Sequence, residues 1–259
     1  MRLNILVMTL KGGGSKTTIS SIIASYLNNS TLIEVDKINK SDERINLRDY
    51  YKSIQLDWNN DTNKSFTEFE DLLLEDGIKI IDVGAVKLEV FHKTMSESEN
   101  YDLIDLLIVP SMDGNDDFEV GFKMLLNVKD FIDMDKVLIA FSRFNENSYT
   151  VEEQFDSWFE NEKLLKDDFN IDLCENYFVI NDSYAIKKAR KVGETVRFFA
   201  DQDPTAVRKF AQDTSITKAE RKKRNAIRTV VQKANAIYNV SFVPMLQLID
   251  QKIKSLKKG

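Results

Sequence analysis

The stretch Lys11–Thr18, KGGGSKTT, decides how the rest of the chain is interpreted. It follows an apolar run at residues 3–10 that predicts a buried strand, and it precedes a helix-periodic segment at residues 15–28. A glycine-rich turn between a strand and a helix directs backbone N–H groups and the positive end of the helix dipole at one point. The common phosphate loop, G-x-x-x-x-G-K-[ST], has glycines where this chain has Leu10 and Ser15. The stretch therefore predicts a phosphate-binding loop of a different type.

Short apolar runs alternate with longer helix-periodic segments along the chain. Runs that are apolar on both faces fit strands of a parallel sheet covered by helices. The alternation predicts an α/β fold with a doubly wound, mostly parallel sheet. The expected strands, after the first, are residues 31–35, 78–83, 103–110, 136–141 and 177–180, and the expected helices are residues 15–28, 64–75, 117–130, 151–167 and 183–192.

The composition excludes several classes of protein. The 259 residues are 42% hydrophobic and 30% charged, as in soluble globular domains, and no apolar run approaches a membrane span. Cys174 is the single cysteine and His92 the single histidine, which disfavours a disulfide framework, a Cys/His metal cluster and a Ser-His-Asp triad. We expect Cys174 to be a packed thiol.

The C-terminal part differs from the rest. We predict one domain at residues 1–201 and a basic helical extension at residues 202–259 packed on that domain. Asp203-Pro204 indicates the start of a short helix. The capping box Thr217-x-x-Glu220 indicates the start of a long helix that runs to about Tyr238, and Pro244 indicates the start of a last helix. Residues 215–259 hold 11 Lys/Arg and 2 Asp/Glu in a chain of net charge −6. Such a basic tail on an acidic body favours an anionic partner.

The pattern K-G-G-x-x-K-[ST] resembles the deviant Walker A motif of the ParA/MinD superfamily of dimerising P-loop ATPases. The resemblance implies that Lys16 holds the β- and γ-phosphates of ATP, that Thr17 coordinates Mg²⁺, and that Lys11 reaches across a homodimer interface to the partner's nucleotide. Members of the superfamily usually carry glycine where this chain has Ser15, and a Cβ restricts the backbone there, so slow or unusual turnover is expected. The implied nucleotide-binding residues are Lys11, Gly12, Gly13, Gly14, Ser15, Lys16, Thr17 and Thr18.

Two carboxylates at strand ends fit the same site. Asp36, in Glu34-Val35-Asp36, is similar to an aspartate of the superfamily that orients the attacking water. Asp82, at the end of Ile78–Val83, resembles the Walker B aspartate that supports Mg²⁺. An acid at a strand end is common in any α/β fold, and we favour function here because of the loop. Lys11, Lys16 and Asp36 are thus the predicted catalytic residues.

Residues 81–95, 106–117 and 139–147 look similar to ParA-like proteins of plasmid-stability and conjugation systems of the StbB type. The resemblance covers roughly residues 1–200 and is loose outside the loop. Ser142 stands where some relatives have an adenine-contacting asparagine, which weakens any prediction of base specificity. The acidic run at residues 113–119 fits a solvated loop better than a switch loop or metal site.

The basic tail offers a candidate DNA surface. Its predicted contacts are Arg221, Lys222, Arg228 and Lys233, which would bind DNA phosphates without sequence preference and with steep salt dependence. The last helix has Leu246, Ile249, Ile253 and Leu256 on one face with lysines around it. That face suits packing on the body, and it also suits a membrane surface or a partner's groove.

The resemblance implies a cytoplasmic, nucleoid-associated ATPase switch for plasmid partition. Its expected partners are a second copy of the chain, non-specific DNA and a ParB-like or StbA-like protein. A MinD-like membrane-associated ATPase and a conjugation-linked ParA-like protein are the alternatives. A ligase fits less well, and an iron-protein reductase would need cluster cysteines that this sequence lacks.

Overall fold

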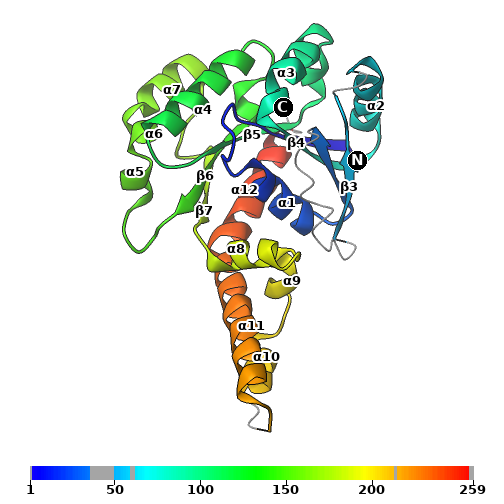
Figure 1. Cartoon of the computed structure of the whole chain (residues 1–259). Helices are drawn as coiled ribbons and strands as arrows, with labels where there is room; N and C mark the ends of the chain where they lie inside the picture. The colour runs from blue at the N-terminus through cyan, green and yellow to red at the C-terminus, as the bar shows by residue number, and fades with distance from the viewer. Residues whose placement is uncertain (1, 36–49, 59–61, 213–214, 257–259) are drawn as a thin grey trace.

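The computed structural model describes residues 2–35, 50–58, 62–212 and 215–256. Within these ranges seven strands form one sheet in the order β3-β2-β4-β1-β5-β6-β7, and every neighbouring pair is parallel (Figure 1). The predicted doubly wound α/β fold is confirmed. The strands are β1 Arg2–Val7, β2 Ser30–Val35, β3 Tyr51–Gln55, β4 Gly77–Val83, β5 Leu106–Ser111, β6 Val137–Phe144 and β7 Tyr177–Asn181.

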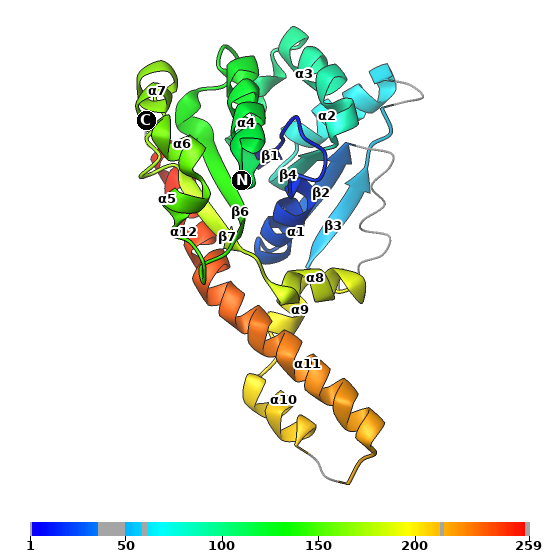
Figure 2. The ribbon, with the colours of Figure 1, turned by 60° about the vertical axis from the view of Figure 1, so that its left-hand side comes forward.

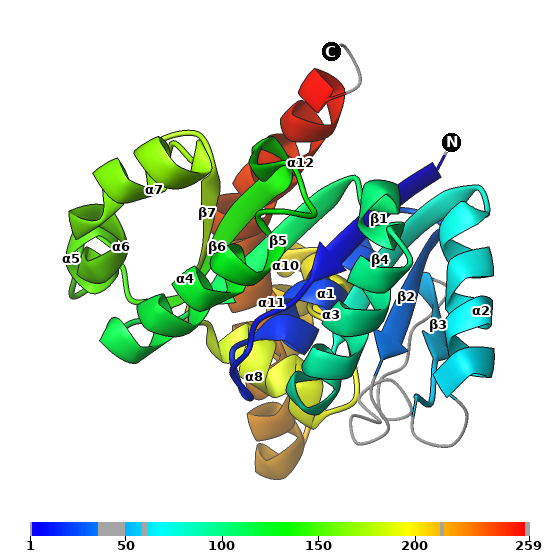
Figure 3. The same ribbon diagram turned by 90° about the horizontal axis from the view of Figure 1, so that it is seen from above.

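Helices cover both faces of the sheet, as the view from above shows (Figure 3). One face packs against α2 (Thr62–Leu74), α3 (Leu88–Glu97), α4 (Asn115–Val128), α5 (Val151–Gln154), α6 (Asp156–Glu160) and α7 (Glu162–Phe169). The other packs against α1 (Lys16–Tyr26), α8 (Tyr184–Lys191), α9 (Val196–Ala200), α11 (Lys218–Ile237) and α12 (Val243–Leu256). The remaining helix, α10, spans Pro204–Ala211.

The central strands are apolar on both faces because each face has its own core. In β1, Leu3, Ile5 and Val7 contribute to the core beside α1, whereas Leu6 and the following Met8 contribute to the core beside α3 and α4. Successive side chains of a strand point to opposite faces. This double burial explains the continuous apolar runs in the sequence.

The C-terminal helices fall into two parts: α10 and α11, here together called the arm, and α12, which packs on the body. Helices α10 and α11 project from the body as a hairpin (Figures 1 and 2). Helix α11 contacts α8 and α9, and α12 lies against β7. The buried residues of α11 all lie in its second half: Val230, Val231, Ala234 and Ile237. The side chains of Asp203 and Thr217 cap α10 and α11. Of the predicted capping box, the bond from Glu220 N to Thr217 Oγ1 is present, whereas the Glu220 carboxylate accepts from Arg224 Nε at 3.3 Å. The division after residue 201 stays a prediction.

The apolar face of α12 packs on the body. Met245 and Ile249 are buried in the same core as β1 and α1, with Leu246 and Ile253 packed against it. Lys252 donates a hydrogen bond to the Oδ1 atom of Asn176. Packing on the body, one of the three roles considered for this face, is the one that the structure shows.

Some elements differ from the sequence-based prediction. Strand β3, YKSIQ, is an edge strand with little apolar character, so its sequence carries no clear signal. Helices α3 and α9 were also not predicted, although Leu88, Phe91 and Met95 have helical spacing and are buried. The single helix expected at residues 151–167 is wrong, because the chain breaks there into α5, α6 and α7.

Gly121 of α4 should not tolerate a side chain. A Cβ at this position would lie 2.5 Å from Cζ2 of Trp158, whose indole Nε1 donates to Ser111 Oγ at 2.9 Å. Overpacking typically costs about 1–3 kcal/mol, and a contact as short as 2.5 Å with a buried ring places the cost toward the upper end. This cost exceeds the roughly 1 kcal/mol that alanine gains over glycine in a helix. We expect Gly121→Ala to lower the free energy of unfolding in urea. Lys123→Ala, an exposed change on the same helix, should stay within about 0.5 kcal/mol, and equal stability of the two variants would contradict the packing argument.

Candidate nucleotide site

The loop KGGGSKTT connects β1 to α1 and leaves its outer side open. A Cβ added at Gly12 or Gly13 would meet nothing within 4 Å, and Gly13 has a φ of +78°. The first main-chain hydrogen bond of α1 runs from Ile19 N to Ser15 O at 3.0 Å. The N–H groups of residues 16–18 precede it, at the helix end that attracts anions. This geometry can cradle a phosphate group.

Ser15 adopts a left-handed backbone with φ 65° and ψ 4°. The Cβ of serine makes this region of backbone conformation unfavourable, whereas glycine has no Cβ and adopts it readily. The structure therefore explains why glycine is the usual residue here in the motif that this loop resembles. Ser15 thus adopts a backbone conformation that suits glycine, and its Cβ makes that conformation strained.

The two lysines of the loop have different surroundings. Lys16 is buried, and its Nζ donates to the main-chain oxygens of Lys11 (2.8 Å) and Thr9 (3.3 Å). Lys11 lies at the rim, where its Nζ is 2.5 Å from Oδ2 of Asp117 in the first turn of α4. The hydrogen bond to Asp117, with the nearby charges of Asp117, Asp116 and Asp113, raises the pKa of Lys11. Lys16 thus lies within the loop, and Lys11 is held by an acidic residue of its own chain.

Asp82 lies beside the loop, and the structure does not describe Asp36. Asp82 is buried near the end of β4, in register with Val7 of β1 and Glu34 of β2. The carboxyl ends of parallel strands share one edge of the sheet, so Asp82 is at the edge where the loop begins. Thr17 is half-buried in the first turn of α1. Asp36 lies outside the described residues.

Two adjoining hollows extend from the loop. The first, here called the phosphate hollow, is lined by residues 12–18, Ala85, Val86, Arg143 and Arg190. The second, the side hollow, shares Ser15, Thr18 and both arginines with it and continues past the ends of β6 and β7 to Asn181 and Asp182. Ser142 also lines the side hollow, but its Oγ donates to Ser111 O at 3.2 Å. The sequence predicted no role for Arg143 or Arg190. Arg190 in particular reaches the loop only because α8 packs beside it.

The predicted DNA-binding residues all lie on α11, and none of them lines either hollow. Figure 2 shows α11 extending away from the sheet. Arg221, Lys222 and Lys233 are exposed on α11, whereas Arg228 is half-buried and its Nε is inaccessible to solvent. The arm therefore presents three of the four predicted contacts to solvent.

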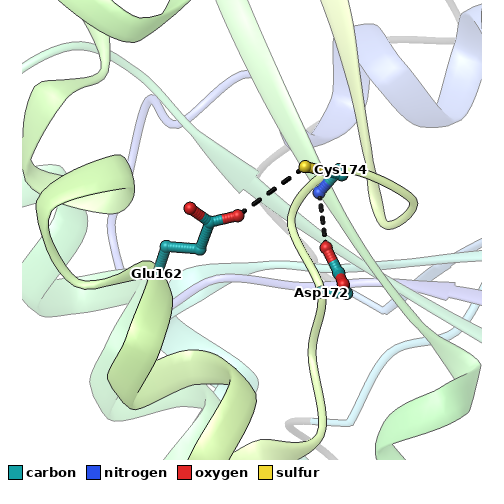
Figure 4. A group of neighbouring side chains, drawn as sticks. All are labelled: Glu162, Asp172 and Cys174. Atoms are coloured by element: carbon teal, nitrogen blue, oxygen red, sulfur yellow. Dashed lines mark hydrogen bonds between the residues drawn. The ribbon is translucent and has the colours of Figure 1, made fainter.

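The predicted packing of Cys174 is wrong, because this cysteine is exposed. It is grouped with Glu162 and Asp172 (Figure 4): its Sγ lies 3.7 Å from Glu162 Oε1, and its main-chain N donates to Asp172 Oδ1 at 3.0 Å. The two carboxylates raise the pKa of the Cys174 thiol, which disfavours the thiolate that a metal would need. Lys166 already pairs with Asp172 at 2.7 Å. We assign no metal role to this group.

Replacing Ser15 with glycine should stabilise the fold. The left-handed backbone costs a non-glycine residue about 1–2 kcal/mol, of which glycine's extra unfolded-state entropy offsets about 0.4–1 kcal/mol. We expect Ser15→Gly to raise the free energy of unfolding in urea. Ser21→Gly, within α1 and with its Oγ bonded to Thr17 O at 2.7 Å, should lower it by about 0.5 kcal/mol or more. A loss of stability in both variants would show that the left-handed conformation of Ser15 is not strained.

Comparison with known proteins gives likenesses of structure. No family model matches the sequence, and no curated protein matches it. The structure aligns with a proposed plasmid partition protein from Borrelia burgdorferi B31 bound to AMPPNP, with a TM-score of 0.50 and 16% identity over 90% of this chain and 99% of that chain. It also aligns with apo McdA from Cyanothece, with a TM-score of 0.50 and 13% identity over 78% of this chain and 94% of that one. At these identities the likeness concerns the fold alone: the chain shares the parallel α/β fold of these two proteins.

Proposed function

We propose that this chain is a Mg²⁺-dependent ATPase of the ParA type, which dimerises on binding ATP and acts in plasmid partition or DNA segregation. The observation that supports it most is the loop itself. The open glycines, the helix N-terminus and the buried Lys16 converge at the edge of the sheet where Asp82 lies. The solved Borrelia protein of the same fold carries AMPPNP.

The residues around the loop fit a nucleoside triphosphate with a bound Mg²⁺ ion. The N–H groups of residues 16–18 and the ammonium of Lys16 supply positive charge to the phosphates, while Thr17 and Asp82 would hold Mg²⁺, Asp82 through the ion's hydration shell. The metal supplies further charge neutralisation, which phosphoryl transfer needs more than covalent catalysis. Asp36 is the proposed residue for orienting the attacking water.

Dimerisation gives Lys11 its proposed role. In the isolated chain Lys11 is bound to Asp117, and 37% of its side chain is exposed. Lys11 must exchange this carboxylate for the phosphates of the partner's nucleotide, as an arginine finger does. Hydrolysis should therefore depend on dimer formation.

The arm is the proposed DNA surface, and a ParB-like or StbA-like protein is the proposed regulator. Residues 204–237 carry nine Lys/Arg and two Asp/Glu. None of residues 218–229, the first half of α11, is buried. A nucleoid-associated, cytoplasmic location follows from this proposal. For the membrane-associated alternative, none of the described helices is long and apolar enough to cross a membrane, and the apolar face of α12 is already packed.

Variants of the two lysines should separate binding from turnover. Lys16→Ala removes the ammonium at the loop, so we expect loss of ATP binding in calorimetry. Lys11→Ala keeps the cradle, so it should bind ATP but fail to dimerise or hydrolyse it.

The readouts are ATP titration, oligomer size by light scattering and phosphate release, with Lys191→Ala as a surface control. A Lys11→Ala variant that forms an active dimer would refute the assignment to this type of ATPase. Unchanged ATP binding by Lys16→Ala would refute the site.

DNA binding should depend on the exposed basic residues of the arm. We expect the ATP-bound protein to bind a short duplex of arbitrary sequence with an affinity that falls steeply with salt. The triple change of Arg221, Lys222 and Lys233 to alanine should weaken binding. It should also reduce the slope of log affinity against log salt by about 0.9 for each DNA phosphate that the variant no longer neutralises.

Fluorescence anisotropy at several salt concentrations measures both quantities. The control exchanges the exposed Lys93, Lys123 and Lys163 for alanine, because these lie on α3, α4 and α7 at the opposite face of the sheet. If both triple variants behaved like the unchanged protein, the arm would not be the DNA surface.

A further inference from the structure

The phosphate hollow contains two arginines in addition to the lysine that the loop motif supplies. Its lining contains Lys16, Arg143 and Arg190, and the described lining contains no carboxylate. This contrasts with the chain as a whole, which has 42 acidic and 36 basic residues. A hollow of this charge is complementary to a polyphosphate.

Arg143 is placed by an irregular strand end. The pairing of β6 with β7 shifts register between Ser142 and Phe144, and Arg143 has a left-handed φ of 62°. The side chain of Gln154 spans this irregularity: its Oε1 accepts from Asn145 N at 2.8 Å, and its Nε2 donates to Arg143 O at 3.1 Å. A left-handed non-glycine residue persists only where its surroundings fix it, and Gln154 supplies that support.

Arg190 is placed by the packing of α8. Ser183 caps this helix, and Ala185 and Ala189 are buried in the core shared with α1 and α11. Because these alanines fix the rotation of α8, the neighbouring Arg190 lines the hollow beside residues 17 and 18. The position is thus set by the fold and not by an ion pair.

Two lysines near these arginines have acidic partners. Lys11 pairs with Asp117, and Lys187 of the side hollow pairs with Asp182 at 2.7 Å. In the part of the chain that the structure describes, neither Arg143 nor Arg190 has an ion pair. Both arginines are exposed at the hollow and can accept an anion from solution without first losing a carboxylate.

We propose that Arg143 and Arg190 form an arginine pair that binds the phosphate chain of the nucleotide, with Gln154 as the residue that positions Arg143. This inference rests on the proposed function, because it assumes a nucleotide at the glycine loop. A guanidinium suits the role since its planar fork donates two parallel hydrogen bonds to a phosphate. The pair supplies charge that the loop motif alone does not encode.

Arg190→Ala tests the pair, with Lys191→Ala as its matched control. Lys191 is the next residue of the same helix, carries the same charge, is exposed and lines neither hollow. We expect Arg190→Ala to weaken ATP binding in calorimetry roughly 10- to 100-fold, the range for hydrogen bonds to charged groups, and Lys191→Ala to bind as the unchanged protein does. Arg190→Lys, which keeps the charge without the fork, should give an intermediate affinity.

Arg143→Ala should weaken binding in the same range, and Gln154→Ala should do so less, because it leaves the guanidinium present but poorly placed. Thermal unfolding of each variant checks that the fold is retained. Equal ATP affinity of Arg190→Ala and Lys191→Ala, while Lys16→Ala no longer binds, would overturn the arginine pair and leave the proposed function standing. Unchanged binding by Lys16→Ala would instead remove the proposed function itself.

Discussion

The burial of β1 on both faces is the constraint on which the rest of the structure depends. Because Leu3, Ile5 and Val7 fill one core and Leu6 fills the other, the strand can neither rotate nor slip by one residue without exposing a row of apolar side chains. Its carboxyl end is therefore fixed at one edge of the sheet. All its neighbours are parallel, so their carboxyl ends meet at the same edge, and the loop, Asp82 and Ser142 lie together although they are far apart in sequence.

The left-handed turn at Ser15 is the local counterpart of that constraint. It lets the chain leave a buried strand and enter α1 at once, so that the helix N-terminus faces the edge of the sheet. The two lysines of the loop have different partners: the Lys16 ammonium donates to the main-chain oxygens of Lys11 and Thr9, and the Lys11 ammonium pairs with Asp117 at the rim. Since solvent reaches the Lys11 side chain, water can compete for its ion pair. A lysine held in this way can change partners, whereas the buried Lys16 has a fixed place.

What the sequence could predict follows from how local each signal is. The glycine loop, the central strands and the caps of α10 and α11 are encoded by neighbouring residues, and all were predicted. Strand β3 was missed because an edge strand is stabilised by its neighbour more than by its own apolar residues. The pairing of Lys11 with Asp117 joins residues 106 positions apart, and Arg190 reaches the loop through the packing of α8. No pattern along the chain carries such contacts, so they required the fold.

The separation of the basic arm from the acidic body has an electrostatic consequence. The first half of α11, residues 218–229, has no buried residue and at about 1.5 Å per residue extends for about 18 Å. The Debye length at physiological ionic strength is about 8 Å, so the tip of the arm lies about two screening lengths from where the helix joins the body. A basic helix packed flat on an acidic body would have its field cancelled by neighbouring carboxylates. Projection keeps the field of the arm positive, and α8, which contacts α11 and also lines the hollows, joins the arm to the candidate nucleotide site.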